Sequence, residues 1–224
     1  MNIAICLSGS LRKIKKSLRS VQDISKTGNI KLFIHTWNFE EKINLQNQRV
    51  LPDEDSNTNY LLNTFNFESI LIDKYESKTP IFEQSKKHSV KLTLYPDKFT
   101  YYPMHYSIKR ANDLKKIYEI ENDFIFDVVY RMRFDSEILN PEKLPTNKIN
   151  ENVIIIPNTD RDHSGINDQF AYGSSSGMDC YCNLFNSLSE LNGTYWNPEQ
   201  LLLKYLQNQS VQIRRSELNV DIYQ

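Results

Sequence analysis

The sequence predicts one α/β domain, a sandwich with a mainly parallel central sheet and helices on both faces. Three observations lead to this class. Continuous apolar runs typical of buried strands recur along the 224 residues. Segments with apolar residues at helical spacing separate these runs. Polar and charged residues gather where the runs end, which is where open α/β sheets bind ligands.

Composition narrows the class of protein. With 39% hydrophobic and 25% charged residues, the chain is globular rather than disordered. A net charge of −1 gives no basis for bulk binding of nucleic acid. No aliphatic run approaches the roughly 18 residues of a membrane span. The three cysteines form no disulfide framework, which favours a reducing, cytoplasmic location.

The first strand is expected at Asn2 to Leu7, followed by Ser8 and Gly9 and then a helical pattern. Strand, glycine turn and helix is the geometry in which backbone N–H groups meet a phosphate. We therefore expect Ser8, Gly9 and Arg12 to contact a nucleotide.

Basic residues line one face of this first helix, at Arg12, Lys15 or Lys16, and Arg19. Such a face is most simply a solvated helix surface. The functional alternative is peripheral contact with an anionic membrane surface that carries a lipid-linked acceptor.

A second strand is expected at Lys31 to Trp37, with His35 and Trp37 at its carboxyl end. These are strand-end core residues or, equally, groups that bind a nucleotide sugar. The next segment, Glu40 to Asn59, is polar and is expected to be a loop. A short helix at Tyr60 to Phe65 should follow.

A third strand is expected at Ser69 to Asp73. Irregular chain should then run from Lys74 to Thr100, with one short strand at Val90 to Tyr95. A helix should begin at Pro103, because proline suits a first helical turn. Arg110 lies off the apolar stripe of that helix.

The most informative stretch runs from Asp127 to Leu139. Its period-two pattern places Arg131, Arg133 and Asp135 on one face of a strand. Asp135 and Glu137 then arrive where the strand should end, and two oxygen ligands there suit Mg²⁺ or Mn²⁺. The arginines would hold the oxygens of a diphosphate through charge-assisted forks. The simpler interpretation is an ordinary strand end with an Arg–Asp surface pair.

The rest of the chain is expected to continue the alternation of strands and helices. A strand at Val153 to Pro157 precedes a polar loop at Asn158 to Asn167. Asp168 opens the next strand, so it is fixed on one side and borders a loop on the other. A helix at Met178 to Leu191 should follow.

The last helix should begin at Asn197, with Pro198 and Glu199 in its first turn. A terminal strand is expected at Val211 to Arg215. Glu199 has a simple alternative role, since a carboxylate in the first turn stabilises the helix dipole.

An ordered set of motifs carries a resemblance to a known family. The motifs are I-C-L-S-G-S-L-R, F-I-H-T-W, Y-R-M-R-F-D-S-E, N-D-Q-F-A-Y-G and P-E-Q-L-L-L-K-Y-L. An apolar strand that ends in a D-x-D-like triplet, here Asp135-Ser136-Glu137, is similar to that of nucleotide-sugar-dependent glycosyltransferases of the Rossmann-like GT-A fold. The order of motifs resembles the small glycosyltransferases of bacterial and viral surface-polysaccharide clusters.

The resemblance implies a single glycosyltransferase domain over residues 1–224. Residues 1–137 would form the half that binds the nucleoside diphosphate sugar, and residues 138–224 the acceptor side. Asp135 and Glu137 would hold Mn²⁺ or Mg²⁺, and Arg110 would contribute to donor binding. The acceptor would be a hydroxyl of a glycan or lipid-linked glycan.

For an inverting reaction, a carboxylate must accept the acceptor's proton. Asp168 is the first candidate because of its place after a polar loop, and Glu199 is the second. A retaining reaction would not need this base. Two other classes stay open: a nucleotide- or sugar-binding module without turnover, and a sulfotransferase-type enzyme that modifies glycans.

Overall fold

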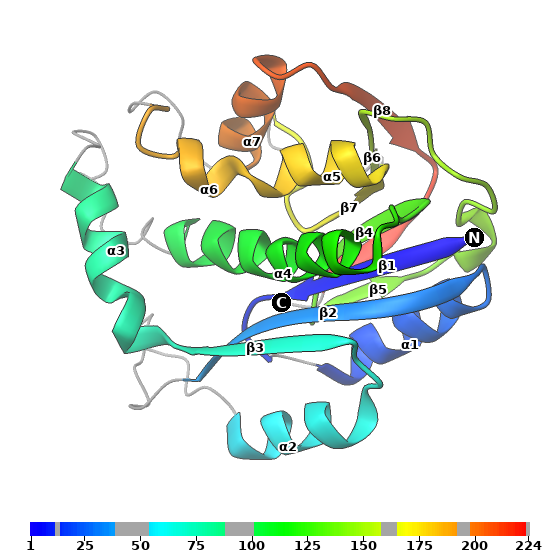
Figure 1. The fold of residues 1–224 in the computed structure, drawn as a ribbon, viewed down its shortest axis with the longest axis horizontal. Helices are drawn as coiled ribbons and strands as arrows, with labels where there is room; N and C mark the ends of the chain where they lie inside the picture. Colours follow the sequence, from blue (N-terminus) through cyan, green and yellow to red (C-terminus); the bar gives the residue numbers. More distant parts are fainter. Residues whose placement is uncertain (12–13, 39–53, 88–100, 158–164, 192–197, 223–224) are drawn as a thin grey trace.

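The computed structural model describes residues 1–11, 14–38, 54–87, 101–157, 165–191 and 198–222. Figure 1 shows these stretches as a layered arrangement of helices around one sheet. The predicted class, an α/β fold with a mainly parallel sheet and helices on both faces, is confirmed.

Seven strands form the central sheet in the order β3-β2-β1-β4-β7-β6-β8. They are β1 (Asn2–Ser8), β2 (Asn29–Asn38), β3 (Ser69–Lys74), β4 (Val128–Arg133), β6 (Val153–Pro157), β7 (Phe170–Gly173) and β8 (Gln212–Ser216). Only β7 among them runs antiparallel to its neighbours, β4 and β6. A separate two-stranded sheet pairs β5 (Ser136–Ile138) with β9 (Val220–Ile222).

Helices cover both faces of the sheet. They are α1 (Ile14–Ser25), α2 (Glu54–Thr64), α3 (Tyr75–Lys87), α4 (Tyr101–Asn122), the 3-10 turn η3 (Pro141–Lys143), α5 (Ser175–Cys182), α6 (Leu184–Ser187) and α7 (Pro198–Gln207). The long helix α4 crosses one face over β1 and β2 (Figure 1), and α1 lies on the opposite face. Within the described ranges, no helix is both long and apolar enough to cross a membrane.

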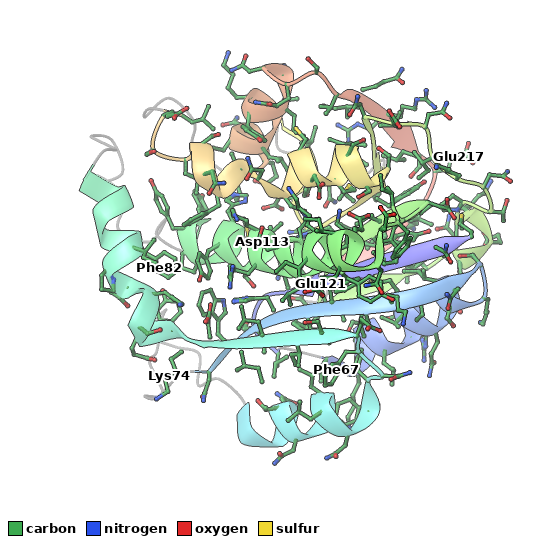
Figure 2. All side chains as sticks on the ribbon, viewed as in Figure 1. Phe67, Lys74, Phe82, Asp113, Glu121 and Glu217 are labelled. Carbon is green, nitrogen blue, oxygen red and sulfur yellow. The ribbon has the colours of Figure 1, made fainter. Side chains whose placement is uncertain are left out.

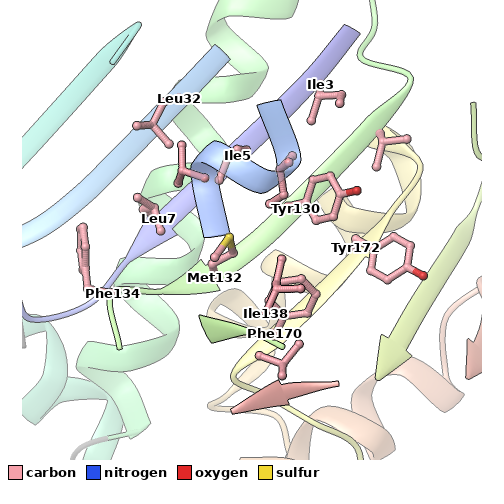
Figure 3. Close-up of a cluster of buried hydrophobic side chains, with 14 of the residues drawn as sticks. Ile3, Ile5, Leu7, Leu32, Tyr130, Met132, Phe134, Ile138, Phe170 and Tyr172 are labelled. Carbon is pink, nitrogen blue, oxygen red and sulfur yellow. The ribbon is translucent and has the colours of Figure 1, made fainter. Parts of the chain in front are cut away.

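Strand alternation divides the buried apolar side chains into two cores. Ile3, Ile5 and Leu7 of β1 lie in the core on the α1 side, which Figure 3 shows in close-up. Ala4 and Cys6 lie in the second core, between the sheet and α4. Because β1 is buried on both faces, its sequence is a continuous apolar run rather than an alternating one.

The expectation of irregular chain from Lys74 to Thr100 is wrong for its first part, where α3 forms despite Pro80. The side chain of Phe82 lies toward α4 (Figure 2), where its ring is 5.7 Å from that of Tyr106. Tertiary burial of this face therefore outweighs a sequence with no clear helical stripe. The strand expected at Val90 to Tyr95 lies outside the described residues.

Three further boundaries differ from the sequence expectations. The loop expected at Glu40 to Asn59 ends earlier, because α2 begins at Glu54. The helix expected at Met178 to Leu191 is two helices, α5 and α6, which meet at Asn183. Asp135 lies in the turn after β4, and only Ser136 and Glu137 of the acidic triplet lie on β5. The sequence did not indicate the pairing of β5 with β9, because both strands are only three residues long.

Candidate active site

The carboxyl ends of three parallel strands bring predicted site residues into one row. In the sheet register Ser8 of β1 pairs with His35 of β2 on one side and with Arg133 of β4 on the other. Two residues earlier, Cys6 of β1 pairs with Arg131 of β4. Cys6 lies in the core on the α4 side, so strand alternation places the whole row on that face. Ser8, His35 and Arg133 were predicted separately, and the fold brings them together.

The loop after β1 is tied to β2 and α4 by hydrogen bonds. The Gly9 N–H donates to Ser107 Oγ at 2.9 Å and, less closely, to the His35 carbonyl at 3.3 Å. The Thr36 hydroxyl donates to the Gly9 carbonyl at 2.9 Å. Gly9 has a φ of 115°, and a Cβ built there would meet nothing within 4 Å. The loop therefore has a fixed backbone with open space beside it, as a close ligand contact requires.

His35 extends this network to the end of β3. Its Nδ1 lies 2.7 Å from Ser107 Oγ, and its Nε2 lies 3.2 Å from Asp73 Oδ2. Burial lowers the pKa of His35 to about 4, so the ring is neutral at pH 7. The carboxylate of Asp73 can only accept, so we assign the proton to Nε2 and let Nδ1 accept from Ser107.

Asp73 has two further partners. Tyr106 donates its hydroxyl to Asp73 Oδ2 at 3.0 Å, and Lys78 Nζ lies 3.4 Å from Oδ1. Burial alone would raise the pKa of Asp73, but the hydrogen bonds from His35 and Tyr106 lower it overall. The carboxylate is thus held ionised as the anchor of the network.

The order Asp73–His35–Ser107 has the composition of a hydrolase triad, but not its geometry. Ser107 is fully buried, and its oxygen already accepts from the Gly9 N–H. A nucleophile must be exposed to its substrate. The three side chains therefore hold the loop after β1 in place at Gly9.

An aromatic cluster adjoins this support. The Trp37 ring stacks on the Tyr106 ring at 5.5 Å and an interplanar angle of 28°. His35, Tyr75 and Phe82 approach Trp37 edge-on. Trp37 is buried, so these rings form a wall that fixes the ends of β2 and β3.

Arg131 is the largest fully buried side chain of the described chain, at 1% exposure. Its Nε and Nη1 have no hydrogen-bond partner among the described residues. Burial lowers the pKa of Arg131, with attraction from Tyr181 and Asp168 opposing this effect. A guanidinium still stays protonated, so the interior holds a positive charge with unused donors.

His105 of α4 lies beside Arg131. Burial, followed by the charge of Arg131, lowers the pKa of His105 to about 3. Its Nε2 is buried and has no partner in the described part of the chain. Buried donors without partners are rare in folded proteins, so this pair is a candidate binding position for an anion or a hydroxyl.

The two predicted catalytic carboxylates lie in the same region. Burial raises the pKa of Tyr101 to about 12, and Glu199 and Asp168 both add to the shift. The same two carboxylates raise the pKa of buried Tyr181. Asp168 and Glu199 are therefore electrostatic neighbours, although 31 positions separate them in the sequence.

The chain before Asp168 packs tightly on the start of α7. The Ile166 N–H donates to the Glu199 carbonyl at 3.2 Å. A Cβ at Gly165 would lie 2.2 Å from the Glu199 carbonyl carbon. Glycine is thus required at 165, and this contact brings Glu199 toward Asp168.

The acidic triplet does not form a ready-made metal site. The Arg133 fork grips Asp135, with Nε 2.8 Å from Oδ1 and Nη2 2.6 Å from Oδ2. Glu137 instead binds α1, with Lys16 Nζ 3.1 Å from Oε2 and Arg19 Nη1 2.7 Å from Oε1. In the described ranges no group of three His, Cys, Asp or Glu side chains could hold a metal ion. The two carboxylates do not fit a shared divalent cation in this arrangement.

Of the remaining predicted donor-binding residues, Arg110 lies near this row and Arg12 cannot be placed. Arg110 pairs with Asp113 along α4, at 3.2 Å, and its guanidinium lies 6.0 Å from the Tyr106 ring centre. Its charge adds to the effect of burial in lowering the pKa of His35. Arg12 lies outside the described residues. Of the basic face on the first helix, Lys16 and Arg19 pair with Glu137, so the predicted membrane contact stays a prediction.

Sequence reasoning missed four polar residues of this region: Asp73 as an anchor, His105, Ser107 and Lys115. Ser107 and Lys115 are fully buried. Ser107 was expected to lie off the apolar stripe of its helix. The signal available in the sequence is helical spacing, because Ser107 lies four positions before Ala111 of the apolar stripe and Lys115 four positions after it.

Lys115 anchors α4 to α5 through a buried ionic network. Its Nζ lies 2.8 Å from Glu119 Oε2, 2.8 Å from Asp179 Oδ1 and 2.6 Å from Ser175 Oγ. Every direction of the ammonium group is used, so this lysine is structural.

The sequence matches no protein-family model and no curated protein. Among solved structures, a crystal structure of mouse xyloside xylosyltransferase 1 in its apo form is similar. The match covers 96% of this chain and 85% of that chain, with 9% sequence identity and a TM-score of 0.46. A likeness of this degree concerns the fold alone.

Proposed function

We propose that this chain is a glycosyltransferase that moves a sugar from a nucleoside diphosphate sugar to a hydroxyl of a glycan or lipid-linked glycan. The observation that carries the proposal is the buried, partly unpartnered guanidinium of Arg131 at the carboxyl ends of parallel strands. Such an edge is where α/β sheets bind ligands, and a buried cation there favours an anionic ligand. The motif resemblance described above points to the same class.

The support network gives the β1 loop a role in this reaction. Ser107 and His35 fix Gly9, whose open side lets a ligand approach the backbone closely. The nucleotide end of the donor would lie along this loop, with its diphosphate toward Arg133. Preorganised contacts of this kind lower the cost of ordering the ligand.

In an inverting reaction the acceptor oxygen attacks the anomeric carbon of the donor. The bond from that carbon to the phosphate oxygen breaks, and its electron pair leaves with the nucleoside diphosphate. The acceptor's proton goes to a carboxylate, for which Asp168 is the first candidate and Glu199 the second. Their shared influence on Tyr101 supports a common location for the pair.

Nothing tests the divalent cation predicted from the sequence. Asp135 and Glu137, the residues that would hold it, are paired instead with Arg133 and with Lys16 and Arg19 of α1, and the transfer proposed here depends on none of the charge that a metal would supply. The division into a donor half at 1–137 and an acceptor half at 138–224, and the cytoplasmic location, also stay predictions.

A thermal-shift assay tests the proposal. We expect UDP or GDP to raise the melting temperature of the wild-type chain, with Mn²⁺ and EDTA as parallel conditions. A shift with adenosine 3′,5′-bisphosphate alone would favour a sulfotransferase-type enzyme. A shift with free sugars but with no nucleotide would favour a binding module without turnover.

A further inference from the structure

The acidic triplet is already neutralised by protein cations. Both oxygens of Asp135 are held by the Arg133 fork, and each oxygen of Glu137 has its own cation, from Lys16 and Arg19. Both carboxylates are 4% exposed. A metal ion would have to displace these contacts before it could bind.

The charges near the triplet lie on two sides of the sheet. On the α1 side, Lys16 and Arg19 are paired with Glu137. On the α4 side, Arg133 pairs with Asp135, Asp168 attracts Arg131, and the charge of Arg133 adds to the effect of burial in lowering the pKa of Arg131. The two guanidinium groups would repel a divalent cation placed against them and attract a diphosphate.

We propose that Arg131 and Arg133 bind the donor's diphosphate directly and thereby replace the divalent cation that Asp135 and Glu137 were expected to hold. This inference rests on the proposed function and specifies its ligand contacts. Arg131 offers its two unpartnered N–H groups, Nε and Nη1. Arg133 offers its fork, because a guanidinium binds phosphate in the same bidentate way as a carboxylate.

Asp135 then has a role opposite to that of a metal ligand. Its carboxylate competes with the diphosphate for the Arg133 fork and holds the arginine in place while the site is empty of ligand. Glu137 is held by Lys16 and Arg19 on the α1 side and takes no part in this competition. If Asp135 competes with the diphosphate, removing its charge should preserve or raise the affinity for the ligand. If Asp135 ligates a metal, removing its charge should lower that affinity.

The variant Asp135→Asn distinguishes direct binding of the diphosphate by Arg133 from metal binding by Asp135. If Arg133 binds the diphosphate directly, the variant should bind UDP, GDP or inorganic pyrophosphate as tightly as the wild type or several-fold more tightly in EDTA. If Asp135 ligates a metal, the variant should lose the part of the affinity that Mn²⁺ provides. Because the side chains have nearly the same shape, a folding defect is a minor concern, and circular dichroism checks it.

The experiment is isothermal titration calorimetry of the whole chain with UDP, GDP and pyrophosphate, each in EDTA and in Mn²⁺. We expect wild-type affinity to be independent of Mn²⁺, and Arg133→Gln to weaken it by about tenfold or more. Arg214→Gln on β8 is the matched control and should leave affinity unchanged, since this exposed arginine donates its hydrogen bonds to Gln212 of the same strand. Mn²⁺ titration followed by electron paramagnetic resonance should show no site on the protein alone.

The outcomes separate this inference from the proposed function. Binding of a nucleoside diphosphate only in Mn²⁺, with loss in Asp135→Asn, overturns the inference and leaves the glycosyltransferase proposal standing. Binding of pyrophosphate in EDTA through Arg133, without binding of any nucleotide, supports the anion site and overturns the proposed function. Absence of binding by all three ligands in both conditions overturns both.

Discussion

Replacing Ser107 with alanine should weaken the fold and loosen the β1 loop together. The side chain is fully buried, and its oxygen serves both the Gly9 N–H at 2.9 Å and His35 Nδ1 at 2.7 Å. Without it, His35 Nδ1 has no donor, and the Gly9 N–H keeps only the longer 3.3 Å contact to the His35 carbonyl. Leaving buried His35 Nδ1 unpaired costs about 1–3 kcal/mol, and losing the shorter Gly9 hydrogen bond adds about 1 kcal/mol, so we expect a loss of about 2–4 kcal/mol.

Equilibrium urea unfolding at pH 7 measures this loss as a lower midpoint at unchanged slope. Amide hydrogen exchange should report faster exchange at Gly9, because its hydrogen bond is the contact removed. The control is Ser25→Ala, which removes an exposed hydroxyl that donates to the Gln22 carbonyl at 2.7 Å. Its stability should change by no more than about 0.5 kcal/mol. Equal stability of the two variants, with unchanged exchange at Gly9, would refute the role assigned to Ser107.

Three further predictions concern other parts of the molecule. Lys115→Met should cost about 3 kcal/mol in urea unfolding, since it removes the fully buried cation that Glu119 and Asp179 share. Lys116→Met, with a 4.0 Å contact to Asp179, should cost less than about 1 kcal/mol. Similar losses in the two variants would contradict the structural role of Lys115. Both His35 and His105 are neutral in the fold, with pKa values lowered to about 4 and about 3, so the unfolded chain gains protons first as the pH falls below 6.5. Stability should therefore decline between pH 6.5 and 4 by about 1.4 kcal/mol per pH unit for each histidine, and a flat profile in calorimetric melting would contradict this. Asp168→Asn should lower turnover by about 10²–10⁴-fold with donor affinity little changed, and normal turnover in a variant that melts early would show that Asp168 only caps a turn.

Local patterns predicted the strands well because burial on both faces leaves a continuous apolar run. Asn2 to Leu7 is such a run, and β1 is Asn2–Ser8. Strand alternation also predicted correctly that Arg131 and Arg133 share a face, since period-two geometry depends only on the strand itself. The row of Ser8, His35 and Arg133 followed from strand ends that meet at one sheet edge.

Contacts between elements that are distant along the chain could not be predicted from the sequence. Glu137 lies 118 positions from Arg19, and nothing local indicates that β5 packs on α1. Ser107 supports Gly9 only because of how α4 is rotated over β1, which tertiary packing sets. The same holds for His105, whose place beside Arg131 depends on that rotation. Helix α3 was not predicted because its sequence has no apolar stripe at helical spacing. Among its described side chains, Phe82 is the one that is buried in the core.

Saturation-transfer NMR of the wild-type chain, with a panel of UDP- and GDP-linked hexoses and the corresponding free hexoses, tests whether the protein binds a nucleotide sugar. We expect at least one nucleotide sugar to receive saturation on both its base and its sugar protons, whereas free hexoses should receive little. Arg133→Gln should reduce the signal, and Arg214→Gln should not. A panel in which no nucleotide sugar binds, or in which free hexoses bind as well as their nucleotide-linked forms, would contradict the proposed function.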